Sequence, residues 1–166
     1  MNRTAPTIEQ LRHLLSYDPE SGALIWATNR RGPIRAGDIA GKIDKNGYRQ
    51  VMIAGKEYAA HRLCWAIHHG AAPAGMIDHI NGDKSDNRIS NLRDASRAIN
   101  NQNLRSAHSR NCSGLLGVTF DKSRGRFVAS IFSGGKKINL GRFLSADDAH
   151  AAYVKAKREL HPGCTI

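Results

Sequence analysis

Residues 77–92 read IDHINGDKSDNRISNL, a run of oxygen-bearing side chains in which a histidine directly follows an aspartate. An EF-hand loop would need acids at alternating positions before a glycine and a glutamate near its end. Here Ile77 lies five residues before Gly82, and Arg88 lies six residues after it. The spacing therefore excludes a calcium loop and leaves two interpretations, a polar turn built from Asn and Asp or an active site.

The surroundings of this run favour an active site. The apolar pair Met76-Ile77 directly precedes Asp78 and His79, so a strand end can present both side chains at the mouth of a loop. Asn91 follows a dozen residues later, and Asn100 falls on the next expected helix. Together they supply an oxygen ligand for a hard metal, a base, an amide to orient the base and a second oxygen ligand. Hydrolysis of a phosphodiester needs an activated water and neutralised phosphate oxygens, which a neutral histidine and one metal can provide.

The N-terminal part of the chain predicts a helix followed by β-structure. A capping box beginning at Thr7 predicts a helix over residues 8–16. Short β-like runs then follow, with an Asn-Gly hairpin signal at residues 45–47. Residues 58–68 have no helix breaker, and residues 94–103 are expected to form a short helix with Asp94 as its N-cap.

The C-terminal part predicts three strands and one helix. Residues 105–112 are polar and basic without apolar periodicity, and we expect a linker there. Strands are expected over 116–120, 126–132 and 136–141, and a helix from the Ser145 cap to about residue 161. Alternation would place one set of apolar side chains under the helix: Val118, Phe120, Phe127, Ala129, Ile131, Ile138 and Leu140. The outward set would be Thr119, Arg126, Val128, Ser130, Phe132, Lys137 and Asn139.

Charge indicates a polyanionic partner. The formal net charge is +11 and the isoelectric point about 10.1, which favours nucleic acid, although a merely basic soluble protein would show the same composition. Residues 104–166 hold 11 Lys/Arg against 4 Asp/Glu, giving +7, and residues 1–103 hold 14 against 10, giving +4. No apolar run could span a bilayer, and the start MNRTAP lacks the apolar core of a signal peptide. The three cysteines form no CxxC pair, so we expect reduced thiols and a cytoplasmic protein of a bacterial or phage-infected cell.

The chemistry-bearing segments resemble the HNH endonucleases of phages, including intron-encoded nicking enzymes. The resemblance covers residues 55–103 and is carried by AHRLCW (60–65), IDHINGDK (77–84), DNRISNLR (86–93) and NNQN (100–103). It implies that His79 is the general base, that Asn91 holds and polarises His79, and that Asp78 and Asn100 bind one divalent metal. The family motif ends in a second histidine, and the phage subset also has asparagine there. The amide oxygen of Asn100 is a hard donor, so the resemblance implies Mg²⁺ or Mn²⁺ and no zinc.

Residues 113–161 resemble the Apetala/ethylene-response-factor-type DNA-binding domain, which also occurs fused to phage HNH nucleases. The segments GLLGVTF (114–120), GRFVASI (125–131), INLGRF (138–143) and SADDAHAAY (145–153) carry this resemblance. It implies that the outward face of the sheet lies in the major groove, although Val128 and Phe132 stand where polar readers are expected. The residues expected to contact phosphates or bases are Thr119, Arg124, Arg126, Lys136, Lys137, Asn139 and Arg142.

The sequence therefore predicts an α+β protein with an HNH ββα-metal core, an N-terminal helix and β-hairpin region, and a small three-stranded antiparallel sheet packed on one helix. The expected domains are residues 1–104, with the core at 76–104, a linker at 105–112, and residues 113–166. The expected activity is metal-dependent nicking or homing-type cleavage of double-stranded DNA by a monomer, two chains being needed to cut both strands together. His61 and Arg62 are candidate phosphate contacts, His61 having the alternative of a core residue with a satisfied ring. A catalytically silent DNA-binding protein and an RNA-binding module are the alternatives, the latter weakened by few aromatic side chains.

Overall fold

The structure is a computed structural model that describes residues 5–166. Residues 1–4, which belong to the start inspected for a signal peptide, lie outside the described residues. The chain divides between Ser96 and Arg97 into two compact units. Within residues 5–166 no helix combines the length and the apolar character needed to cross a membrane.

The first unit begins with a helix whose start the sequence predicts well. α1 (Ile8–Leu14) opens with the expected capping box, in which the Thr7 side chain accepts from the Gln10 backbone. The helix ends before the expected residue 16, because residues from Leu15 onward form β1 (Leu15–Tyr17), which pairs antiparallel with β2 (Leu24–Trp26). Leu15 is 1% exposed, so strand pairing with burial replaces the last helical turn.

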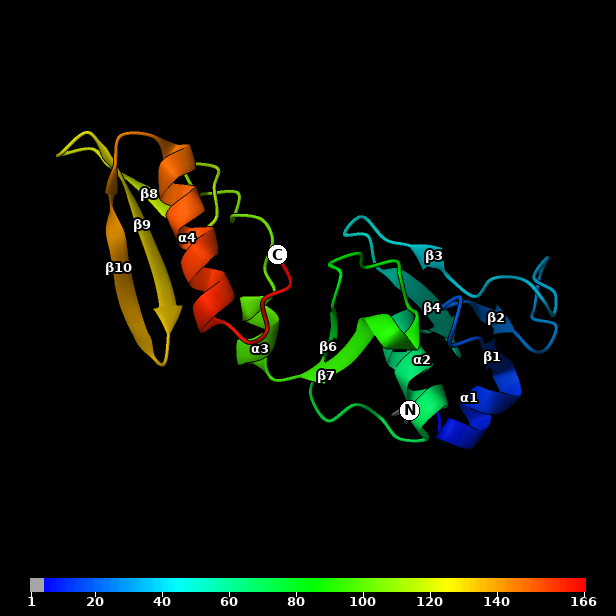
Figure 1. Cartoon of the computed structure of the whole chain (residues 1–166). Helices are drawn as coiled ribbons and strands as arrows, with labels where there is room; N and C mark the ends of the chain where they lie inside the picture. The colour runs from blue at the N-terminus through cyan, green and yellow to red at the C-terminus, as the bar shows by residue number, and fades with distance from the viewer. Residues whose placement is uncertain (1–4) are drawn as a thin grey trace. The chain divides into compact units, whose positions relative to one another are not determined.

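A small sheet and a second helix complete the core of this unit (Figure 1). β3 (Lys42–Ile43), β4 (Arg49–Ile53) and β5 (Lys56–Ala59) form an antiparallel sheet in that order, with the expected hairpin turn at residues 44–48 between the first two. α2 (Ala60–His69) follows β5 directly and ends at Gly70, which adopts the left-handed conformation. The buried residues of α2 pack with the strands into one core that includes Trp26, Val51, Leu63 and Cys64.

Residues 77–92 form the end of one strand, the connecting loop and the start of the next strand in a β-hairpin. β6 (Met76–His79) pairs antiparallel with β7 (Leu92–Ala95), and a short 3-10 helix, η1 (Ile89–Asn91), leads into β7. The expectation that Asp94 caps a helix is wrong, because Asp94 lies in β7. Its carboxylate instead accepts from the backbone N–H groups of Ala74 and Gly75 at 2.7 and 2.8 Å. The helix begins later, as α3 (Arg97–Gln102).

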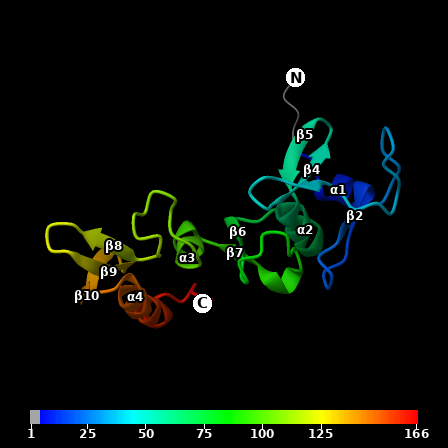
Figure 2. The same ribbon diagram turned by 90° about the horizontal axis from the view of Figure 1, so that it is seen from above.

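The second unit contains α3 and a three-stranded sheet with one helix (Figures 1 and 2). β8 (Val118–Asp121), β9 (Arg126–Ser133) and β10 (Lys136–Phe143) are antiparallel in the order β10-β9-β8, and α4 (Ala146–Leu160) packs on one face. Ser145 caps α4 as expected. The α+β class, with a three-stranded sheet packed on one helix, is therefore confirmed.

The expected alternation in this sheet is correct for the central strand and incomplete at its neighbours. Val118, Ala129 and Ile131 are buried under α4, but Phe120 and Ile138 are 42% and 37% exposed. Both residues lie on outer strands of the sheet, near strand ends that a 15-residue helix cannot fully cover. The prediction from alternation that Phe120 and Ile138 belong to the core is therefore wrong.

A β-bulge in β10 changes which side chains share the outer face. Asn139 lies opposite Ser130 and Gly141 lies opposite Ala129, so one extra residue is inserted between them. Arg142 consequently lies opposite Val128, on the face that carries Asn139, whereas strict alternation would turn it inward. Gly141 has φ +131°, a conformation that glycine tolerates.

The division of the chain differs from the expected domain limits. Contacts place α3 with the C-terminal sheet, so the compact units meet at residue 96 and not at the expected linker of residues 105–112. The expected end of the HNH domain at residue 104 concerns function and not compactness, and it stays a prediction.

Candidate active site

Asp78 and His79 lie buried at the end of β6, where the loop begins. Their side chains are 7% and 4% exposed, and they occupy consecutive positions at the end of the strand. Asp78 lies directly opposite Arg93 of β7. The Arg93 guanidinium donates from Nε and Nη2 to the same Asp78 carboxylate oxygen, Oδ2, at 2.8 and 2.6 Å. A buried carboxylate needs such compensation, and Arg93 provides it.

The His79 imidazole is oriented by Asn87. The His79 Nε2 and Asn87 Oδ1 atoms are 3.2 Å apart, and Asn87 is 2% exposed. A carbonyl oxygen can only accept, so Nε2 carries the proton in this pair and the lone pair of the neutral ring lies on Nδ1. The contact therefore orients the His79 ring and favours the tautomer with the proton on Nε2.

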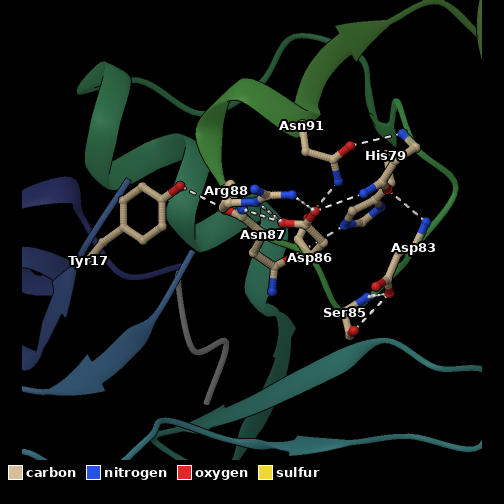
Figure 3. Close-up of polar contacts among 9 residues, drawn as sticks. Tyr17, His79, Asp83, Ser85, Asp86, Asn87, Arg88 and Asn91 are labelled. Atoms are coloured by element: carbon tan, nitrogen blue, oxygen red, sulfur yellow. Dashed lines mark hydrogen bonds and ion pairs between the residues drawn. The ribbon is translucent and has the colours of Figure 1, made fainter. Parts of the chain in front are cut away.

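Asn91 has a different task from the expected one. Its Oδ1 accepts from the Asn81 backbone N–H at 2.9 Å, and its Nδ2 donates to the Asp86 carbonyl at 2.8 Å (Figure 3). The expected direct bond from the Asn91 side chain to His79 is wrong, because both ends of the amide are used on the loop backbone. Asn91 closes the loop between the strands and ties down the segment that carries Asn87.

Side-chain contacts within the loop hold its shape. Arg88 donates to both oxygens of Asp86, with Nη2 to Oδ2 at 2.6 Å, and Asn81 Nδ2 donates to Oδ2 at 2.7 Å. These hydrogen bonds, first of all from Arg88, lower the pKa of Asp86 to about 2. Asp83 accepts from the Ser85 backbone and hydroxyl in the same loop. Asp83 and Asp86 therefore fold the loop, as turn-forming residues do.

The loop is also tied to the body of the first unit. The Tyr17 hydroxyl donates to the Asn87 carbonyl at 2.7 Å, and the Ile89 backbone N–H donates to the Pro19 carbonyl at 3.1 Å. Burial raises the pKa of Tyr17, so its hydroxyl stays protonated and can donate. A Cβ at Gly22 would lie 2.5 Å from the Arg88 nitrogen, so only glycine allows this close approach.

His61 of α2 lies beside His79. The two rings meet edge to face with centroids 5.2 Å apart, and Tyr48 lies 5.5 Å from His61 and 6.1 Å from His79. Burial, followed by the charges of His79 and Arg62, lowers the pKa of His61 to about 4. Its Nδ1 atom is buried and has no hydrogen-bond partner among residues 5–166, and the choice between a phosphate contact and a core residue stays open. Arg62 donates to the Gly75 carbonyl at 3.0 Å and braces the segment before β6.

The metal assignment rests on oxygen donors from two parts of the chain. Asp78 offers a buried carboxylate, and Asn100 lies on α3, in the second unit. The pairing of Asp78 with Asn100 stays a prediction. Among residues 5–166 no group of three or more His, Cys, Asp or Glu side chains gathers in metal-binding fashion. Magnesium does not need such a group, because it binds one or two protein oxygens, water and substrate phosphates. The donors present suit a hard cation.

The residues expected to contact DNA in the second unit are all accessible. Each one is exposed, and they come from β8, the turn after it, β9 and β10: Thr119, Arg124, Arg126, Lys136, Lys137, Asn139 and Arg142. Arg124 donates to Asp121 at 3.2 Å, so part of its charge is compensated locally. Their contact with DNA stays a prediction.

Sequence reasoning missed three residues that shape the site: Tyr17, Asn87 and Arg93. In the sequence Asn87 does not differ from the other Asn and Asp residues of the loop, and its burial becomes visible only in the structure. Arg93 could have been found from the hairpin, since antiparallel pairing at this register places it opposite Asp78. Tyr17 is 70 residues from Asn87 in sequence, and no local pattern connects them.

The chain is similar to a known protein family, to a phage protein and to a solved structure. Residues 58–102 match the model of the HNH endonuclease family. The chain is 32% identical over 120 residues to Protein 3.8 of Escherichia phage T7, an alignment that covers 70% of this chain and 93% of the phage protein. A solved structure, "DNA binding and cleavage by the HNH homing endonuclease I-HmuI", aligns with a TM-score of 0.42 and 24% identity, over 58% of this chain and 55% of its own. The chain thus spans about half the length of that solved protein.

The family match begins in β5 and ends at the last residue of α3, so it includes Asp78, His79, Asn91 and Asn100. The phage relative extends the similarity well beyond this segment. The chain therefore belongs to the HNH endonuclease family.

Proposed function

We propose that the protein is a metal-dependent endonuclease that hydrolyses phosphodiester bonds of double-stranded DNA. The observation that carries this proposal is the buried His79 at the end of β6, beside Asp78 and with one ring nitrogen held by Asn87. A base must be correctly oriented to accept a proton, and the Asn87 contact fixes the orientation of the His79 ring. Membership of the HNH family and the +11 charge support DNA as the substrate.

In this mechanism His79 removes a proton from the attacking water while Asn87 holds its ring. Asp78 and Asn100 would hold one Mg²⁺ or Mn²⁺. When bound, the metal neutralises the scissile phosphate and stabilises the departing 3′ oxygen. Asn91 keeps the loop closed so that Asn87 stays against His79. His61 presents a partnerless buried nitrogen next to His79 and is a candidate contact for the phosphate or the attacking water.

The second unit would hold DNA through the outer face of its sheet, as in Apetala/ethylene-response-factor-type domains. Support comes from the accessible basic side chains of β9 and β10 and from the bulge that brings Arg142 to that face. Phe132 is 65% exposed on the same face, where it can pack against sugar or base edges but cannot read a hydrogen-bonding pattern. Phosphate contacts would therefore supply most of the affinity for DNA. The expected activity is nicking by a monomer.

A catalytically silent DNA-binding protein is the second candidate, and the Asp78–Arg93 ion pair favours it. The guanidinium occupies one oxygen of the carboxylate that would bind the metal. In an active enzyme Arg93 must either share Asp78 with the metal or release it.

Nicking of supercoiled plasmid separates the two candidates. Wild type and His79→Ala would each be incubated with DNA in Mg²⁺, Mn²⁺ or EDTA, and DNA binding would be measured in parallel. We expect open circles that depend on the metal, and a loss of about 10²- to 10⁴-fold in His79→Ala, the usual contribution of a general base. If both proteins bind DNA equally and neither shows metal-dependent nicking on any substrate, the protein is the catalytically silent DNA-binding protein.

A further inference from the structure

We propose that a clamp formed by Lys157, Gly163 and Thr165 holds α3 in place and so positions Asn100. The inference deepens the proposed function and rests on it, because Asn100 matters there as a metal ligand. All the contacts that support it lie within the second unit. Figures 1 and 2 show the segment after α4 returning beside α3.

α3 needs external support to remain a helix. It has six residues, none of them buried, and isolated helices of that length are unstable in water. It is not packed tightly on the sheet either. A cavity of about 460 Å³ separates Ala98, Asn101 and Gln102 of α3 from the end of β9, Tyr153 and His161. The helix therefore depends on contacts at its C-terminal end.

The segment after α4 supplies these contacts. The Gly163 backbone N–H donates to the Gln102 side-chain oxygen at 3.0 Å. The Thr165 hydroxyl donates to the Asn103 side-chain oxygen and accepts from Arg105 Nη2 at 2.6 Å. Asn103 is 7% exposed, so its bond to Thr165 is made in a protected position. The residues on both sides of the α3 C-terminus are thus tied to this segment.

Lys157 of α4 adds a buried amine to the clamp. The residue is 1% exposed, and its ammonium group donates to the Leu104 carbonyl just beyond α3. Burial lowers the pKa of this amine. A buried ammonium is costly unless its donors are satisfied, so this backbone carbonyl is a specific partner and not a chance surface contact.

Gly163 is required by the space beside α3. A Cβ at this position would lie 2.8 Å from the Ile99 carbonyl oxygen and 3.0 Å from Gln102 Oε1. Even alanine would therefore push against the backbone of α3 directly next to Asn100. Pro162 is exposed and offers a neighbouring position for a control substitution.

The experiment uses the full chain with four substitutions. Gly163→Ala and Thr165→Val should loosen α3, whereas Thr165→Ser keeps the hydroxyl and Pro162→Ala is the matched control. Hydrogen exchange at residues 97–102, Mn²⁺ affinity, plasmid nicking and DNA affinity would be measured for each protein. We expect exchange to rise at least tenfold in Gly163→Ala and Thr165→Val, with at least tenfold losses in Mn²⁺ affinity and nicking. DNA affinity should stay within twofold, and Thr165→Ser and Pro162→Ala should match wild type.

The outcomes separate failure of the clamp from failure of the proposed function. Unchanged exchange at α3 in both Thr165→Val and Gly163→Ala would overturn the clamp, whatever the activity. Faster exchange in an active protein that keeps its Mn²⁺ affinity and nicking would overturn the positioning role. If the wild-type protein never nicks DNA, the proposed function is wrong. The hydrogen-exchange data would still show whether the segment after α4 holds α3. If Gly163→Ala does not fold, the Thr165 pair decides alone.

Discussion

At the scale of single residues, two asparagines in one loop do different work. Asn87 faces the His79 imidazole, whereas Asn91 bonds the loop backbone at Asn81 and Asp86. Both are buried, at 2% and 6% exposure, so neither is a solvent-facing turn residue. The difference predicts that one substitution affects chemistry and the other affects stability.

Replacing Asn87 should slow cleavage without unfolding the protein. Asn87→Leu has nearly the same shape and lacks the acceptor for His79 Nε2, so the imidazole loses its orientation and its preferred tautomer. Loss of one such hydrogen bond, about 1–1.5 kcal/mol in the transition state, corresponds to roughly tenfold slower nicking. Single-turnover nicking rates would measure this, with Asn87→Asp as the variant that keeps an acceptor. Equal rates for wild type and Asn87→Leu would show that Asn87 does not orient the base.

Replacing Asn91 should cost stability first. Asn91→Leu leaves the Asn81 N–H and the Asp86 carbonyl without their part-buried partner, and we expect about 1–3 kcal/mol lower free energy of unfolding. Urea unfolding followed by circular dichroism would give the value, with the exposed Ser90→Ala next to it as control. A difference below about 0.5 kcal/mol would mean that the loop holds its shape without this amide.

At the scale of elements, the loop between β6 and β7 is a folded unit held by charge as well as by hydrogen bonds. Arg88 and Asn81 both donate to Asp86, whose side chain is 13% exposed. The loop therefore depends on the ionised form of one carboxylate.

Acid should weaken this loop. The pKa of Asp86 is lowered to about 2, so its ionised form stabilises the folded state above the ordinary value of 3.8, and the contribution is lost as the pH falls from about 4 towards 2. After allowance for solvent screening we expect about 1 kcal/mol. The free energy of unfolding of wild type and Asp86→Asn would be compared at pH 7, 4 and 2.5. The gap between them should shrink across this range, and a gap that stays constant with pH would contradict the assignment.

The β10 bulge is the feature of the second sheet that alternation could not reveal. It turns Arg142 to the face of the sheet that carries Asn139. Lys155 is also exposed, but it lies on α4, which packs against the opposite face of the sheet. Arg142→Ala should lower the slope of log K against log salt by about 0.9, the value for one lost phosphate contact. Lys155→Ala removes the same charge and should leave the slope nearly unchanged. Equal effects of the two variants would indicate binding by net charge alone.

At the scale of the whole molecule, the sequence motif and the compact units do not coincide. The family match ends at residue 102, but the units meet at residue 96, so α3 belongs to the motif by sequence and to the C-terminal unit by contacts. A truncation after residue 112 would remove Lys157, Gly163 and Thr165 together with the sheet. It would therefore disturb Asn100 as well as DNA binding, and point substitutions on the sheet face test DNA binding more cleanly.

The sequence by itself determined the family, the α+β class and most helix and strand positions, and it indicated Asp78, His79, Asn91 and Asn100 as candidate site residues, because these depend on local periodicity and on fixed spacing within a motif. Only the tertiary structure decided that Asn87 faces His79, that Arg93 pairs with Asp78, that the bulge turns Arg142 outward and that α3 is held by residues about 60 positions later in the chain. Those contacts join residues across strands and between distant segments. Their formation depends on register and packing, which no local pattern specifies.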